Sequence, residues 1–89
     1  MNSLALIVEF FGTFLLLISI LATGNSLMIG GTLALIVFLT GGISGGHVNP
    51  AVSLTMWLNG SITVAELCAY VAVQYAGGAA AYYAYKALA

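Results

Sequence analysis

Asn49 and Pro50 are the residues of this chain whose types and order point most directly to chemistry. They follow a glycine-rich run at residues 41–46, where four of six residues are glycine, a poor composition for a helix interior. Asparagine is a favoured helix N-cap and proline a favoured first helical residue, so a helix should begin here. A helix start carries about half a positive charge, and the asparagine amide donates hydrogen bonds.

The helix predicted at residues 50–58 is apolar and short. Nine residues rise by about 13.5 Å, roughly half of a ~30 Å hydrocarbon core. We interpret residues 43–58 as a re-entrant loop whose half-helix returns to the side from which the loop entered. Irregular backbone is tolerated at that depth only beside protein or a water-filled cavity, which favours an aqueous path. The alternative, a surface loop with a short amphipathic helix, is disfavoured because residues 50–58 have little polar face.

Three longer apolar segments, at residues 4–23, 27–42 and 62–85, must position this loop. The first is interpreted as a retained span rather than a signal peptide, because no Lys or Arg precedes it and Glu9 interrupts it. The last ends in tyrosines and Lys86, which suit a membrane interface. The predicted fold is therefore an all-α membrane protein with three transmembrane helices and one re-entrant half-helix, forming one unit over residues 1–89.

The composition favours lipid as the solvent of this chain. Hydrophobic residues make up 63% of its 89 residues, and the formally charged side chains are Glu9, Glu66 and Lys86. A net charge of −1 provides no basic patch for nucleic acid. A single cysteine, Cys68, excludes an intramolecular disulfide. No nucleophile–base pair, metal-ligand set or phosphate loop is present, so we expect no enzyme activity, metal or cofactor.

Three stretches of the chain resemble the major intrinsic proteins, the family of aquaporins and aquaglyceroporins. Residues 45–54 (GGHVNPAVSL) look like that family's first Asn-Pro-Ala loop, and residues 8–15 (VEFFGTFL) resemble its first-helix signature. Gln74, followed by Gly77 and Gly78, is similar to its third-helix pattern. The matches come in the family's order and spacing. The sequence differs from the family in one respect: family members carry two inverted halves, whereas this sequence has one. In the family's second half an arginine follows Asn-Pro-Ala; the residue at that position here is Val52, so this half resembles the first.

The resemblance implies a pore in which two half-helices meet end to end, with Asn49, Pro50 and Ala51 at the meeting point. The missing half must come from another copy or from a different chain. Lys86 and the N-terminal amine fall on opposite sides of the predicted topology, so the bias in Lys and Arg is weak and both orientations are open. An antiparallel pair of copies would then recreate an inverted repeat.

Other residues take roles from the same resemblance. The family's filter position on its second helix falls on Ile29, and if a copy also serves as second repeat, Val37, Gly46 and Val52 complete the ring. Glu9 matches a glutamate that accepts hydrogen bonds from the pore-loop backbone. A proton-coupling carboxylate and an interfacial position are its alternatives. If Glu9 serves to accept hydrogen bonds from the loop, Glu9→Gln should preserve transport, because an amide keeps one acceptor oxygen.

His47 and Gln74 complete the set of predicted site residues. No second His, Cys or acidic residue lies at ligand spacing from His47, so it is a poor metal site. It is interpreted as holding the loop or lining the pore, and the same two roles are open for Gln74. The predicted partners of the chain are the lipid bilayer, the water or small neutral solute that passes, and other copies of the chain in antiparallel pairs.

The sequence thus predicts a passive channel for water or small neutral solutes such as glycerol, in a multi-pass integral membrane protein. Three other functions stay open. The chain could be an inactive fragment of a full-length aquaporin. It could be a small dual-topology proton-coupled exporter that uses Glu9, although the half-helix has no part in that mechanism. A lysis protein that makes nonspecific holes would not need Asn49, Pro50 and Ala51.

Overall fold

The computed structural model describes residues 2–89, and within them it contains four helices and no strand. They are α1 (Ser3–Thr23), α2 (Ser26–Thr40), α3 (Pro50–Leu58) and α4 (Val64–Leu88). The predicted all-α class, with three longer helices and a short one that begins directly after Asn49, is confirmed.

Local capping sets where the helices begin and end. The Asn2 and Asn25 side chains accept hydrogen bonds from the first N–H groups of α1 and α2, and Gly24 ends α1 in a left-handed conformation, with φ of 56°. Thr63 and Glu66 form a reciprocal capping box, so α4 starts at Val64 rather than at residue 62. The second helix ends at Thr40, two residues earlier than expected, and the Thr40 carbonyl accepts turn hydrogen bonds from the N–H groups of Ile43 and Ser44.

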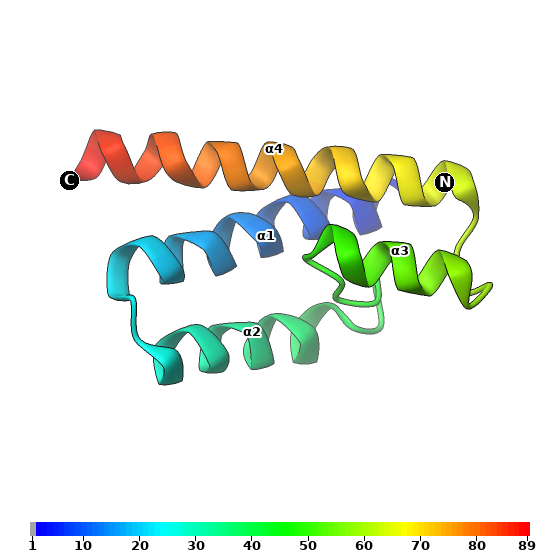
Figure 1. Cartoon of the computed structure of the whole chain (residues 1–89), viewed down its shortest axis with the longest axis horizontal. Coiled ribbons are helices and arrows are strands. Elements are labelled where there is room, and N and C mark those ends of the chain that lie inside the picture. The colour runs from blue at the N-terminus through cyan, green and yellow to red at the C-terminus, as the bar shows by residue number, and fades with distance from the viewer. Residues whose placement is uncertain (1) are drawn as a thin grey trace.

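The arrangement of the helices leaves α3 covering half the length of the molecule (Figure 1). Helices α1 and α4 pack side by side and run in the same direction, and α2 returns beside α1 in the opposite direction. The chain turns back after α2, and α3 starts near the middle of the long axis and packs along α4. The N- and C-termini lie toward opposite ends of this axis.

Two glycines allow these close approaches. A Cβ added to Gly77 of α4 would lie 2.5 Å from the Phe10 carbonyl oxygen of α1, so this crossing requires glycine. A Cβ added to Gly12 would lie 2.8 Å from Val48 Cγ1 and 3.2 Å from Ile36 Cγ2. Gly12 therefore brings α1 against both α2 and the loop that leads to α3.

Polar residues occupy the interior, and most large apolar side chains face outward. The largest fully buried side chains are Gln74, Glu9 and Ser53, while Phe38 and Leu27 are each 84% exposed. Such a distribution suits a lipid surround. By length and apolarity, α1 is the one helix among residues 2–89 that qualifies to cross a bilayer; α2 is apolar but has 15 residues.

Candidate functional site

The site is built around Glu9, a fully buried carboxylate on α1. Its Oε2 accepts hydrogen bonds from the Ser44 hydroxyl at 2.7 Å and the His47 backbone N–H at 2.9 Å. Its Oε1 accepts from the Val48 backbone N–H at 2.8 Å and from Gln74 Nε2 at 2.9 Å. Two backbone N–H groups of the loop, which would otherwise be unsatisfied in an apolar interior, are thus paired with one side chain.

A second layer of hydrogen bonds ties the loop to α3 and α4. Ser53, fully buried in the first turn of α3, accepts from Gln74 Nε2 at 3.0 Å, and its Oγ lies 2.8 Å from His47 Nδ1. The Tyr70 hydroxyl donates to the Ser44 carbonyl at 2.8 Å, and the Tyr70 ring lies 4.9 Å from the His47 imidazole, centroid to centroid. The network joins α1, α3 and α4 through the loop and so fixes where α3 begins.

The loop backbone takes conformations that most residues avoid. Gly45 and Gly46 have φ of 91° and 61°, and a Cβ on Gly45 would lie 2.9 Å from His47 Nε2. Val48 has φ of 43°, a rare left-handed conformation for a β-branched residue. The hydrogen bond from its N–H to Glu9 and the packing of its side chain against Gly12 hold it there.

Asn49 stands at the N-terminus of α3, with its side chain exposed. Its Oδ1 accepts from the Ala51 N–H at 2.8 Å, and the first backbone–backbone hydrogen bond of the helix runs from Ser53 N–H to the Asn49 carbonyl at 3.1 Å. Among residues 2–89, no acceptor pairs with Asn49 Nδ2 or with the N–H groups of Asn49 and Val52. The helix start therefore presents a cluster of free donors at its positive end.

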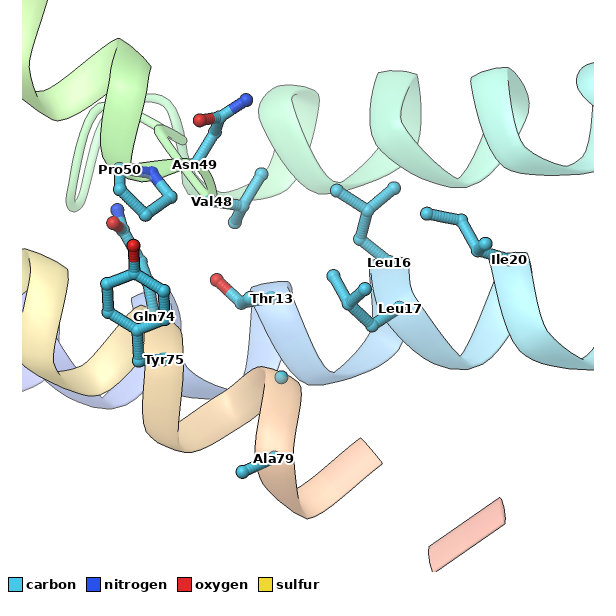
Figure 2. A pocket seen from close by; sticks show the side chains of 11 residues that line it. Thr13, Leu16, Leu17, Ile20, Val48, Asn49, Pro50, Gln74, Tyr75 and Ala79 are labelled. Carbon is cyan, nitrogen blue, oxygen red and sulfur yellow. The ribbon is translucent and has the colours of Figure 1, made fainter. Parts of the chain in front are cut away.

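A cavity of about 590 Å³ lies directly beyond this helix start (Figure 2). Its lining is mostly apolar and comes from three parts of the chain: Thr13, Leu16, Leu17 and Ile20 of α1; Val48, Asn49 and Pro50; and Gln74, Tyr75, Gly78 and Ala79 of α4. It lies along the second half of α1 and the middle of α4, beyond the half of the molecule that α3 covers.

Two buried polar atoms that belong to residues lining the cavity have no hydrogen-bond partner among residues 2–89: Thr13 Oγ1 and Gln74 Oε1. Both side chains are almost fully buried, with 4% of Thr13 and 1% of Gln74 exposed. An unpaired buried polar group costs about 1–3 kcal/mol, so each of these atoms lowers the stability of the fold.

The four predicted filter residues do not line this cavity. Gly46 and Val37 touch, since a Cβ on Gly46 would lie 3.1 Å from Val37 Cα. Ile29 lies about two turns before Val37 on α2 and is partly exposed, and Val52 is partly buried in the first turn of α3. One copy therefore does not gather the four into a ring, and a ring completed by a second half stays a prediction.

Sequence reasoning singled out Glu9, His47 and Gln74 but missed several of their partners. Ser44 and Ser53 lie within or beside the glycine loop, where a buried hydroxyl could have been expected. Tyr70 gave no local signal, because its hydroxyl binds the carbonyl of Ser44, a residue distant in sequence. Thr13 gave none either, and its hydroxyl has no partner within residues 2–89. No group of three or more metal-ligating side chains occurs in the part of the chain that the structure describes.

Comparisons with known proteins found a matching family model and several similar proteins. Residues 2–88 match the family model described as major intrinsic protein. The chain is 37% identical over 84 residues to human aquaporin-9, a match that covers 78% of this chain and 28% of the relative. It is 44% identical over 45 residues to the propanediol uptake facilitator PduF of Salmonella typhimurium, covering 51% of this chain and 17% of the relative.

A third relative, aquaporin Z of Photorhabdus laumondii, is 40% identical over 55 residues, which cover 62% of this chain and 24% of that protein. The chain thus spans less than a third of the length of each of these curated relatives. No solved structure matches it.

Proposed function

Because the chain belongs to the major intrinsic protein family, we propose that it forms half of a membrane channel for water or small neutral solutes. Members of this family are integral membrane channels rather than enzymes, and α1, α2 and α4 would cross the bilayer here. Helix α3 would supply one of the two half-helices that meet at the pore centre. A second Asn-Pro-Ala half completes the pore.

The observation that carries this proposal is the position of Asn49. It caps a helix that begins near the middle of the molecule. Its Oδ1 accepts from the Ala51 N–H, and its Nδ2 has no acceptor within residues 2–89. A free amide donor at the positive end of a helix can hold the oxygen of a water or hydroxyl group. The same positive end disfavours cations, so neutral solutes pass in preference to ions.

The buried network supports the positioning of this donor. Glu9 binds the two residues that precede Asn49 through their backbone N–H groups, and Gln74 and Ser53 brace the first turn of α3. We assign Glu9, His47 and Gln74 to support of the loop on these contacts. A proton-coupling carboxylate would need access to water, whereas Glu9 is fully buried and engages four donors.

The solute class rests on the filter residues and on the relatives. Ile29, Val37, Gly46 and Val52 would form an apolar constriction without arginine, so the pore should admit small polyols such as glycerol as well as water. The relatives' names, two aquaporins and a propanediol uptake facilitator, support small neutral solutes as the class that passes.

The second half comes, in this proposal, from another copy in the opposite orientation. A parallel neighbour would place its α3 in the same half of the membrane and leave the other half unfilled. The termini lie toward opposite ends, and the single basic side chain, Lys86, gives little bias toward one orientation. The alternative, in which a second half is part of the same polypeptide, predicts one orientation only.

The test uses vesicles that contain only this chain, followed by stopped-flow light scattering under water and glycerol gradients. We expect both permeabilities to rise above those of empty vesicles, with no rise in proton or sodium conductance. Permeabilities equal to those of empty vesicles would show that one kind of half does not make a pore.

The orientation has a test of its own. Single cysteines near each terminus, in a Cys68→Ser background, are labelled in intact cells with a membrane-impermeant maleimide. Antiparallel pairing predicts that each terminus is labelled in part of the population. Labelling of one terminus alone would mean that the second half does not come from an inverted copy.

A further inference from the structure

The four asparagines of the chain differ in what holds their side chains. Asn2, Asn25 and Asn49 each cap the start of a helix, and their Oδ1 atoms accept hydrogen bonds from N–H groups of the first turn. Asn59 lies at the opposite end of α3, where its Nδ2 donates to Ser61 Oγ at 3.1 Å and its Oδ1 has no donor within residues 2–89. The side-chain carbonyl of Asn59 is therefore the one that no helix start holds.

The residue after each asparagine decides whether the side chain can react with the backbone. A cyclic imide forms when the backbone nitrogen of the following residue attacks the asparagine Cγ. Gly60 offers this nitrogen without a side chain in the way, and glycine reaches backbone conformations that other residues avoid. Pro50, which follows Asn49, has no backbone N–H to lose, so that pair cannot close the ring. Serine follows both Asn2 and Asn25, and its side chain hinders the same attack.

The turn that contains Asn59 and Gly60 has room for the rearrangement. Residues 59–61 are exposed, Gly60 has φ of 80°, and a Cβ added to it would meet nothing within 4 Å. The turn lies at one end of the long axis, where α3 leads into α4 (Figure 1). The Gly60 N–H donates to the Trp57 carbonyl at 2.9 Å, and this hydrogen bond must open before the nitrogen can attack. Such local opening costs little at an exposed turn.

We propose that Asn59 is a site of spontaneous deamidation through a cyclic imide with Gly60. The Gly60 nitrogen forms a bond to Asn59 Cγ, the bond from Cγ to Nδ2 breaks, and Nδ2 leaves as ammonia with the proton that the Gly60 nitrogen gives up. Water then opens the ring at either of its carbonyl carbons and leaves aspartate or isoaspartate at position 59. The amide is exchanged for an acid without oxidation or reduction, and the step does not depend on the proposed channel.

The product places a negative charge at the C-terminal end of α3. The free carbonyls of a helix give this end a partial negative charge, so a carboxylate is unfavourable there. Isoaspartate also adds a methylene to the backbone between α3 and α4. This insertion disturbs the turn, in which the Ser61 N–H donates to the Met56 carbonyl at 2.8 Å. The same chemistry spares Asn49, because proline follows it, so the chain ages at the outer end of α3 and keeps the amide at its inner end.

Peptide mapping by mass spectrometry tests the site. The full chain in vesicles is incubated at neutral and at mildly alkaline pH, digested, and analysed for the mass change of an amide-to-acid exchange. We expect Asn59 to be modified at least about tenfold faster than Asn25, the internal control, and Asn49 to stay intact. The rate should rise with pH, because the attacking nitrogen must lose its proton. Equal rates at Asn25 and Asn59, or an unmodified Asn59, would overturn the inference.

Asn59→Asp reproduces one product and tests its consequence. The unfolding midpoint in detergent micelles should fall, because the new charge lies at the negative end of α3. Asn25→Asp is the matched control: it places the same charge at the start of α2, where Asp is a favoured cap, and should leave the midpoint unchanged or raise it. Equal shifts in the two variants would contradict the effect assigned to the charge at position 59.

Discussion

The Glu9 carboxylate on α1 accepts a hydrogen bond at 2.8 Å from the backbone N–H of Val48, a residue 39 positions away whose φ is 43°. This contact holds a β-branched residue in a left-handed conformation directly before the proposed pore residue, Asn49. A side chain on one helix thereby sets the direction in which another helix begins.

Glu9→Ala should destabilise the protein strongly, because it leaves four buried hydrogen-bond donors without an acceptor. Each buried donor without an acceptor costs about 1–3 kcal/mol, so a loss above about 3 kcal/mol is expected. The measurement is the helical signal during denaturation in mixed detergent micelles. Glu66→Gln is the control, since an amide can still accept from the Thr63 N–H; equal effects of the two changes would argue against the Glu9 network.

Glu9→Gln should also lower stability, by about 1–3 kcal/mol. The sequence alone led us to expect that an amide would serve, but donors converge on both carboxylate oxygens. The best orientation of the amide lets Ser44 reverse its hydroxyl and still leaves the His47 N–H without an acceptor. Solute flux should persist in proportion to the folded fraction. Full folding with transport abolished would favour the proton-coupled exporter.

Ser53→Ala should cost about 1–3 kcal/mol, because Gln74 Nε2 loses one of its two acceptors and His47 Nδ1 its partner. Thr55→Ala, two residues further along α3, removes an exposed hydroxyl that bonds only to the Ala51 carbonyl of its own helix. Denaturation of both variants in the same micelles gives the comparison. A larger effect at Thr55 than at Ser53 would show that the buried network does not brace α3.

Gly12→Ala tests the contact between α1 and the loop. The new methyl group would meet Val48 Cγ1 at 2.8 Å and Ile36 Cγ2 at 3.2 Å, and such overpacking costs about 1–3 kcal/mol. The unfolding midpoint should fall. Gly30→Ala, where nothing lies within 4 Å, should leave the midpoint unchanged or raise it slightly, since alanine favours a helix. A fall in both variants would point to a general intolerance of added methyl groups.

Much of the fold could be predicted from the sequence because the signals are local. The start of α3 follows from Asn49 and Pro50, and α1 follows from one long, mostly apolar run. The two-residue shift at the start of α4 is also local, since Thr63 and Glu66 form a capping box that the apolar pattern conceals. The early end of α2 is also local, since α2 ends where the glycine run begins at residue 41, and glycine is a poor helix former.

The site was less predictable because its contacts join residues far apart in the chain. The residues around Glu9 lie 35 to 65 positions away, and no spacing rule pairs them. The positive φ of Val48 goes against the preference of a β-branched residue, so the sequence gives no sign of it. The unpaired oxygens of Thr13 and Gln74 become visible only when the packing of α1 and α4 is known.

Asn49→Asp should keep the fold, because Asp also caps a helix through an oxygen that accepts from the Ala51 N–H. It replaces a donor amide by a carboxylate where two positive helix ends are proposed to meet, so cation leak should rise while vesicle insertion stays normal. Sodium-flux and proton-flux dyes in vesicles provide the readout. Asn59→Asp, at the other end of α3, is the control; identical fluxes for the two variants would count against a pore role for Asn49.

The central claim, that Asn49 lines a solute pathway, is tested most directly by blocking that position. Vesicles containing Asn49→Cys in a Cys68→Ser background are studied by stopped-flow swelling before and after a water-soluble methanethiosulfonate reagent, and again after reduction, with Asn59→Cys as the matched variant. We predict that the reagent lowers the water permeability of the Asn49 variant to that of empty vesicles, that reduction restores it, and that the Asn59 variant is unaffected. Water permeability that is the same before and after complete modification of Cys at position 49 would contradict the account.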